Sequence, residues 1–124
     1  MRWVWEGVEV PGEPSDYHFL IQQAVEQLWS RRRDDLEALR FVETFAYLDL
    51  TLIEAAPQAV ALDERDLTKG FVHITTLDRL LTLLEREGAL RDALAICRRA
   101  ERFGERYRRE DLNAKVAALE EERT

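Results

Sequence analysis

The residues of this chain with catalytic or metal-binding potential begin with its two histidines. His18 and His73 each stand beside a predicted helix start, with Asp16 and Asp78 near them as further potential metal ligands. Neither histidine belongs to an HExxH or Cys-His pattern, the spacings that position ligands around one metal ion. We therefore expect each histidine to cap a helix or to lie in solvent.

The other reactive side chains also lack the neighbours that a reaction requires. Cys97 falls on the apolar stripe of a predicted helix and has no base beside it, so it is expected to pack as a small hydrophobic residue. Glu43, Asp49 and Glu54 are separated by six and five residues and do not share one helix face. No Glu-x-x-His pair of a di-metal bundle is present. We expect no enzyme activity, no metal and no cofactor.

The composition predicts a single helical domain, residues 1–124. The chain is 46% hydrophobic and 35% charged, which disfavours disorder and is typical of amphipathic helices. One cysteine excludes an intramolecular disulfide and is compatible with a reducing compartment. No apolar run approaches the roughly 20 residues of a membrane span, and the first 14 residues do not resemble a signal peptide. The expected location is the cytoplasm.

The charge is distributed unevenly along the chain. Residues 1–70 carry 7 basic and 14 acidic side chains, which accounts for the whole net charge of −7, and residues 71–124 carry 11 of each. The net charge disfavours a general nucleic-acid binder. Within the second half, residues 98–109 nevertheless hold six arginines and only two glutamates.

Apolar periodicity and capping signals predict five helices after an extended arm, residues 1–14, that contains Trp3 and Trp5. The predicted helices cover residues 15–30, 34–56, 75–87, 90–103 and 110–122. In the first helix the buried stripe is expected to be Phe19, Leu20, Ala24 and Leu28, with Ile21 as a further member. In the second it is the wide set Leu36, Leu39, Phe41, Val42, Phe45, Leu48, Leu52 and Ile53, which favours a central position with more than one neighbour. The last three stripes are Leu77, Leu80, Leu81 and Leu84; Leu90, Ala93, Leu94, Cys97 and Ala100; and Leu112, Val116 and Leu119.

Residues 74–107 resemble a tetratricopeptide repeat, a 34-residue helix-turn-helix unit. Gly88 stands where the family has its turn glycine, Leu90 at the aromatic or leucine position, and Ala93 and Ala100 at the two small helix-packing positions. The chain departs from the pattern at Leu81, Cys97 and Glu105, where the family often has a small residue, an aromatic and a proline. The arrangement is also similar to an uncharacterised bacterial protein family in which a histidine-containing segment, here with His73, leads into such a hairpin.

The tetratricopeptide resemblance implies an all-α fold, a five-helix antiparallel array of hairpins in which residues 110–122 form a capping helix. It also implies a protein-protein interaction or scaffold module. Such repeats line a concave groove with polar side chains of the first helix. The corresponding residues here are Thr75, Asp78, Arg79, Thr82, Glu85 and Arg86. The alternative is that this polar face is only solvated.

Two further hypotheses concern other partners. The arginine strip, Arg98, Arg99, Arg102, Arg106, Arg108 and Arg109, is the alternative functional surface and would serve a nucleic-acid-associated accessory protein. The uneven charge and the wide stripe of the second helix favour a homodimer, with the N-terminal arm or the helix over 34–56 at its interface. No membrane partner is expected.

Overall fold

The structure, a computed structural model, describes residues 12–123. Over this range the chain is all-helical, with five α-helices, four short 3-10 helices and no strand beyond one isolated bridge between Ala61 and Phe71. Most of the expected extended arm, including Trp3 and Trp5, lies outside the described residues. The chain forms two compact units, residues 1–80 and residues 81–124. This division falls inside a helix rather than between the expected segments.

Helix α2 (Pro14–Ser30) opens the first unit. Pro14 occupies the first turn, where its missing amide costs nothing, and the Glu13 backbone amide donates to the Asp16 carboxylate at 3.2 Å in a capping box. The buried stripe is His18, Ile21, Ala24, Val25, Leu28 and Trp29. Phe19 was expected in this stripe but is 53% exposed. The expectation is wrong because consecutive residues differ by about 100° around a helix, and the stripe is centred on the row that contains His18.

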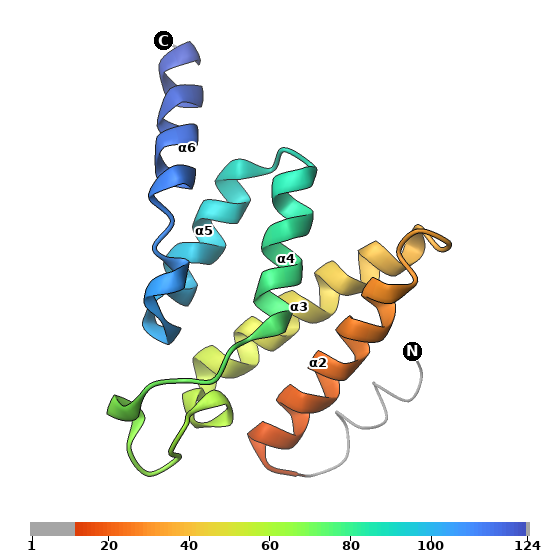
Figure 1. The fold of residues 1–124 in the computed structure, drawn as a ribbon, viewed down its shortest axis with the longest axis vertical. Coiled ribbons are helices and arrows are strands. Elements are labelled where there is room, and N and C mark those ends of the chain that lie inside the picture. The colour runs from red at the N-terminus through yellow and green to blue at the C-terminus, as the bar shows by residue number, and fades with distance from the viewer. Residues whose placement is uncertain (1–11, 124) are drawn as a thin grey trace. The chain divides into compact units, whose positions relative to one another are not determined.

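Helix α3 (Glu37–Ala55) lies beside α2 in the same unit (Figure 1). Its start is supported by the Asp35 carboxylate, which accepts a hydrogen bond from the Glu37 amide at 3.0 Å. Its buried stripe is Ala38, Val42, Phe45, Ala46, Asp49, Leu50 and Ile53. Leu36 and Phe41 were expected to be buried but are 78% and 38% exposed. One face of α3 therefore meets α2, and part of the predicted apolar stripe lies on the opposite face.

The segment after α3 completes the first unit. Pro57 ends the α-helix as predicted and begins a 3-10 helix, Pro57–Val60, that contacts both α2 and α3. A second 3-10 helix, Leu67–Lys69, lies in the polar loop, and Gly70 leaves it with a φ of 96°. Helix α4 (Thr75–Arg86) then begins, and its predicted leucine stripe is buried: Leu77, Leu80, Leu81 and Leu84. The unit boundary follows Leu80 within this helix.

The second unit begins with the last turns of α4, which end in a Schellman motif. Gly88 has a φ of 77°; its amide donates to the Glu85 carbonyl, and the Ala89 amide donates to the Leu84 carbonyl. The predicted turn glycine thus has the left-handed conformation expected of it. Helix α5 (Leu90–Ala100) follows, and its predicted inner residues Ala93, Leu94, Cys97 and Ala100 are buried.

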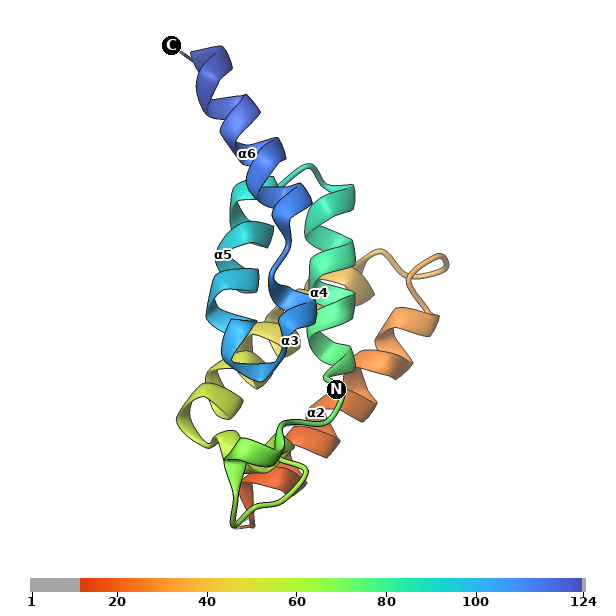
Figure 2. The same cartoon turned by 60° about the vertical axis from the view of Figure 1, so that its left-hand side comes forward.

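The expected helix over 90–103 ends at Ala100 and continues as two 3-10 helices, Glu101–Phe103 and Glu105–Tyr107. Helix α6 (Glu110–Arg123) closes the chain and contacts α5 (Figure 2). An ion pair of 2.7 Å between Arg91 and Glu120 joins these two helices. Leu112 is fully buried, whereas Val116 and Leu119 are half-buried, so α6 buries mainly its first turn.

Candidate interaction surface

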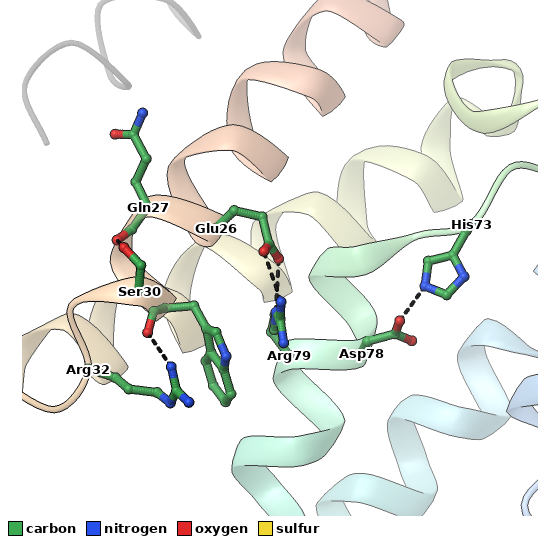
Figure 3. Close-up of polar contacts among 8 residues, drawn as sticks. Glu26, Gln27, Ser30, Arg32, His73, Asp78 and Arg79 are labelled. Carbon is green, nitrogen blue, oxygen red and sulfur yellow. Dashed lines mark hydrogen bonds and ion pairs between the residues drawn. The ribbon is translucent and has the colours of Figure 1, made fainter.

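The polar residues of α4 that were predicted to line a groove divide between the two units. In the first unit, Asp78 pairs with His73, and Arg79 makes a two-pronged hydrogen bond with Glu26 of α2, each prong 2.9 Å long (Figure 3). The bond to Glu26 raises the pKa of Arg79. These two side chains are therefore engaged within the molecule rather than offered to a ligand.

The remaining predicted groove residues offer little free polar surface. Thr75 and Thr82 are half-buried, and Glu85 accepts a hydrogen bond of 2.7 Å from Arg109. Arg86 is exposed but also interacts within the molecule. The six residues remain a predicted binding surface, although three of them must exchange an intramolecular ion pair for any contact with a peptide.

Arg79 also belongs to a cluster around the buried Trp29 of α2. The Arg32 guanidinium lies 4.5 Å and the Arg79 guanidinium 5.1 Å from the centroid of the indole ring, both within the range of a cation-π contact. Arg32 additionally donates to the Trp29 carbonyl at 2.8 Å (Figure 3). The N-terminal half of α4 is thus attached to α2 by an ion pair and by a cation-π contact with one aromatic ring.

The arginine strip lies within the second unit, and five of its six members are exposed: Arg98, Arg99, Arg102, Arg106 and Arg108. Two of these guanidinium groups lie over neighbouring rings, Arg102 over Phe103 at 5.3 Å and Arg106 over Tyr107 at 5.9 Å. Both rings are buried, so they are not available to stack with a nucleic-acid base. The strip offers positive charge without an exposed aromatic platform.

Arg109, the half-buried member of the strip, is held between two carboxylates. Its guanidinium donates to Asp111 at 2.7 and 2.8 Å and to Glu85 at 2.7 Å. These contacts raise the pKa of Arg109, and the bond from Arg109 lowers the pKa of Asp111 to about 2. Arg109 therefore joins α6 to the last turns of α4.

A polar cluster buried in the first unit was not anticipated. His18 of α2, Asp49 of α3 and Thr76 of α4 are all fully buried. The Asp49 carboxylate lies 2.7 Å from His18 Nδ1 and accepts a hydrogen bond of 2.5 Å from the Thr76 hydroxyl. Because a carboxylate accepts hydrogen bonds, the ring proton is assigned to Nδ1. The expectation that His18 caps a helix or lies in solvent is wrong, whereas His73 is exposed as expected.

The geometry of this cluster differs from that of a nucleophilic triad. In a triad the hydroxyl faces the second ring nitrogen of the histidine, which removes its proton. Here the Thr76 hydroxyl donates to Asp49, and His18 Nε2 is buried without a hydrogen-bond partner among the described residues. Asp49 instead binds both of the other groups and so joins three helices. A signal was present in the sequence, because both His18 and Asp49 fall in step with buried apolar residues, where a polar side chain needs a partner.

Cys97 is confirmed as a core residue of the second unit, with 1% of its surface exposed. Burial raises the pKa of its thiol, which opposes formation of the reactive thiolate. Among residues 12–123 no group of three or more histidine, cysteine, aspartate or glutamate side chains is arranged to hold a metal ion.

The least ordinary surface of the first unit is the outward face of α3. We call it the outer stripe: Phe41, Thr44, Leu48, Thr51 and Ala55, which recur at steps of three and four residues along one side of the helix. Four of the five are exposed and Leu48 is half-buried. None of these five is charged, although charged residues make up 35% of the chain. The charged and exposed Glu37 and Arg40 lie in the helical turn that precedes the stripe.

The two threonines make the outer stripe less polar than its composition indicates. Thr44 donates its hydroxyl proton to the Arg40 carbonyl at 3.0 Å, and Thr51 donates to the Tyr47 carbonyl at 3.1 Å. Both donors are thereby used within α3. At the N-terminal end of the stripe, a hollow of about 250 Å³ is lined, among the described residues, by Glu37, Arg40, Phe41 and Thr44.

Comparisons with known proteins do not assign the chain to a family. No family model matches the chain, and neither a curated protein nor a solved structure matches it. No helix in the described part of the chain is both long and apolar enough to cross a membrane.

Proposed function

We propose that this protein is a protein-protein interaction module that docks a partner on the outer stripe of α3. The outer stripe is the single observation that carries the proposal. Along four helical turns it presents only aliphatic, aromatic and internally bonded hydroxyl side chains, whereas exposed helix faces usually carry charge. Depletion of charge with an aromatic residue in the patch is the compositional mark of an interface core.

The tetratricopeptide-like hairpin over 74–107 remains part of the proposal as the scaffold of the module. Its support is local: the Schellman turn at Gly88 and the complete burial of the small residues Ala93 and Ala100. The polar face of α4 is a weaker docking surface than the outer stripe because Asp78, Arg79 and Glu85 are already paired. A reducing cytoplasm suits the single buried cysteine.

The test is site-specific photo-crosslinking in cells that express the protein naturally. A photoreactive amino acid is placed at Thr51 in the outer stripe and, as a matched control, at the exposed Ala95 of α5. We expect adducts with protein from the Thr51 position and a much lower yield from Ala95. Equal yields from both positions, or no adduct from any position of the outer stripe, would contradict the proposed docking surface.

The arginine strip supports a second candidate function, association with nucleic acid. Five exposed arginines within eleven residues favour contact with phosphates, although the net charge of the whole chain opposes it. Affinity for single-stranded RNA is then expected to fall with salt, with a logarithmic slope of about −0.7 per phosphate contact. The double variant Arg98→Gln/Arg102→Gln should reduce this slope, and Arg33→Gln should not. Absence of binding at low salt would exclude this candidate.

A further inference from the structure

We infer that the partner of the outer stripe is a second copy of this chain, with the two α3 helices packed antiparallel about a twofold axis at Leu48. This inference rests on the proposed function, because it names the occupant of the same surface. A symmetric dimer places one patch against itself, so the patch must be complementary to its own reversed image. The order of side chains along the outer stripe meets this requirement.

The sizes of the side chains match when the stripe is reversed. Leu48 is the middle residue of the stripe and meets its own copy at the axis. Phe41 and Ala55 are equally far from Leu48, so each Phe41 ring of one copy lies opposite the small Ala55 of the other. Large residues opposite small ones allow two helices to approach closely. A parallel arrangement would place the two Phe41 rings together and the two Ala55 methyl groups together. Large residues would then face large ones and small residues small ones, so the helices would pack less closely.

The proposed register also fits the length of α3. Ala55, which faces Phe41 of the other copy, is the last residue of α3, and the chain then leaves the helix at Pro57 to form a 3-10 helix that contacts α2 and α3. The hollow beside Phe41, which the charged Glu37 and Arg40 help to line, therefore lies at the edge of the contact.

The absence of charge from the stripe is compatible with a second copy at this surface. Each copy carries −7, so two copies repel each other at long range, and an uncharged stripe adds no further repulsion at the contact itself. In the proposed register the charged residues Glu37 and Arg40 fall beyond the last turn of the other α3. A basic partner, in contrast, would gain nothing from a stripe that has no carboxylate. The outer stripe is therefore suited to a neutral surface such as its own copy.

The extent of the stripe sets the expected strength of the dimer. From Phe41 to Ala55 the helix rises roughly 21 Å at about 1.5 Å per residue, and one helix face is about 10 Å wide. Such a contact covers less than the roughly 800 Å² per partner of a standard stable interface. We therefore expect a reversible dimer that dissociates on dilution. Salt should strengthen it, because screening weakens the repulsion between two chains of net charge −7.

The first experiment is sedimentation of the full chain across a dilution series at two salt concentrations. The mass should rise from that of one chain, 14.5 kDa, to twice that value with concentration, and the midpoint should move to lower concentration at higher salt. Leu48→Glu should remain monomeric, since it places two carboxylates together at the axis, and Ala95→Glu should behave as the unmodified chain. Should Leu48→Glu fold poorly, Thr51→Glu at an exposed position of the stripe serves the same purpose.

The second experiment tests the register by disulfide formation under mild oxidation. Leu48→Cys should give a covalent dimer, because residues that form a disulfide have Cα atoms within about 7 Å. Ala55→Cys should not crosslink to itself but should crosslink to Phe41→Cys when the two are mixed. The native Cys97 is buried and supplies a background control. Crosslinking of Ala55→Cys to itself with equal efficiency would overturn the antiparallel register.

These results separate the dimer from the proposed function. A monomeric mass at all concentrations, or a dimer that Leu48→Glu leaves intact, overturns self-association through α3. If the chain is monomeric while crosslinking at Thr51 in cells yields adducts with a different protein, the docking surface stands and only the identity of its occupant is wrong. Absence of both dimer and adducts overturns the two proposals together.

Discussion

The inner face of α3 holds a carboxylate among apolar side chains, whereas the outer stripe holds uncharged side chains at positions that are mostly exposed to solvent. Asp49 is fully buried between Ala46 and Ile53 of the inner stripe. On the opposite side, Phe41 and Thr51 are exposed. The two faces of one helix thus depart in opposite directions from the usual amphipathic pattern.

The difference teaches that polarity alone does not identify which face of this helix is buried. Asp49 is stable inside because His18 and Thr76 provide hydrogen bonds from two other segments of the first unit. Among the described residues nothing covers the outer stripe in the same way, and we propose that a partner does. The inner face should therefore govern folding, and the outer face should govern association.

Removing the buried carboxylate should have the largest effect on stability. Asp49→Ala leaves the His18 ring N–H and the Thr76 hydroxyl without an acceptor, and each unsatisfied buried group costs about 1–3 kcal/mol. With the cavity that is also created, we expect a loss of about 3–5 kcal/mol in urea unfolding followed by circular dichroism. Glu43→Ala, a half-buried carboxylate on the same helix, should cost less than about 1 kcal/mol. Equal effects of the two substitutions would contradict the special role of Asp49.

A pair of leucines two residues apart compares the two faces of α3 directly. Leu50 is fully buried and Leu48 is half-buried. Leu50→Ala should lower the free energy of unfolding by about 2–5 kcal/mol through lost burial and a cavity. Leu48→Ala should cost only about 1 kcal/mol when measured at dilution, because the side chain loses less contact with the protein. A larger cost for Leu48→Ala would mean that the outer stripe is packed within a single copy.

The sequence predicted the helical class and the interior of the second unit well, because periodicity and turn glycines are local signals. The buried leucines of α4, the turn at Gly88 and the burial of Cys97 all follow from spacing along one helix or one turn. The first unit was harder. Its inner face depends on a histidine, an aspartate and a threonine far apart in the chain, and no local pattern shows that they meet.

The outer stripe could not be separated from the core by sequence for the same reason. Phe41 and Leu48 repeat with helical periodicity, as core residues do. Which side of α3 is covered is decided by the positions of α2, of the 3-10 helix Pro57–Val60 and of Thr76. Within the first unit α3 has more than one neighbour, as predicted, but these neighbours leave part of the predicted apolar stripe exposed. An apolar stripe of this width is expected both when a second helix of the same chain covers it and when a second copy of the chain does.

Adjacent threonines at the start of α4 offer a finer comparison. Thr76 donates its hydroxyl proton to Asp49, whereas the Thr75 hydroxyl oxygen is buried without a hydrogen-bond partner among the described residues. Thr76→Val should therefore cost about 1–3 kcal/mol, since the Asp49 carboxylate loses a donor. Thr75→Val should be neutral or slightly stabilising, because it replaces an unsatisfied hydroxyl group by a methyl group of similar size. In chemical denaturation, the midpoint of Thr76→Val should lie well below that of the unmodified chain, and the midpoint of Thr75→Val should lie at or slightly above it. Coincident midpoints for the two variants would contradict the hydrogen-bond assignment.

The smallest effect is expected on the outer face itself. Thr51 is exposed, and its hydroxyl bonds only to the Tyr47 carbonyl one turn earlier, a contact that slightly disfavours a straight helix. Thr51→Ala removes this contact and introduces the best helix-forming residue, so unfolding free energy should change by no more than about 0.5 kcal/mol, in the stabilising direction. Thr44→Ala, which loses the equivalent bond to Arg40, is the matched control and should behave alike. Both are measured by urea unfolding at a dilution where the chain is monomeric. A loss above about 1 kcal/mol for either variant would show that the outer stripe stabilises the fold of a single copy, and the contrast between the two faces of α3 would then disappear.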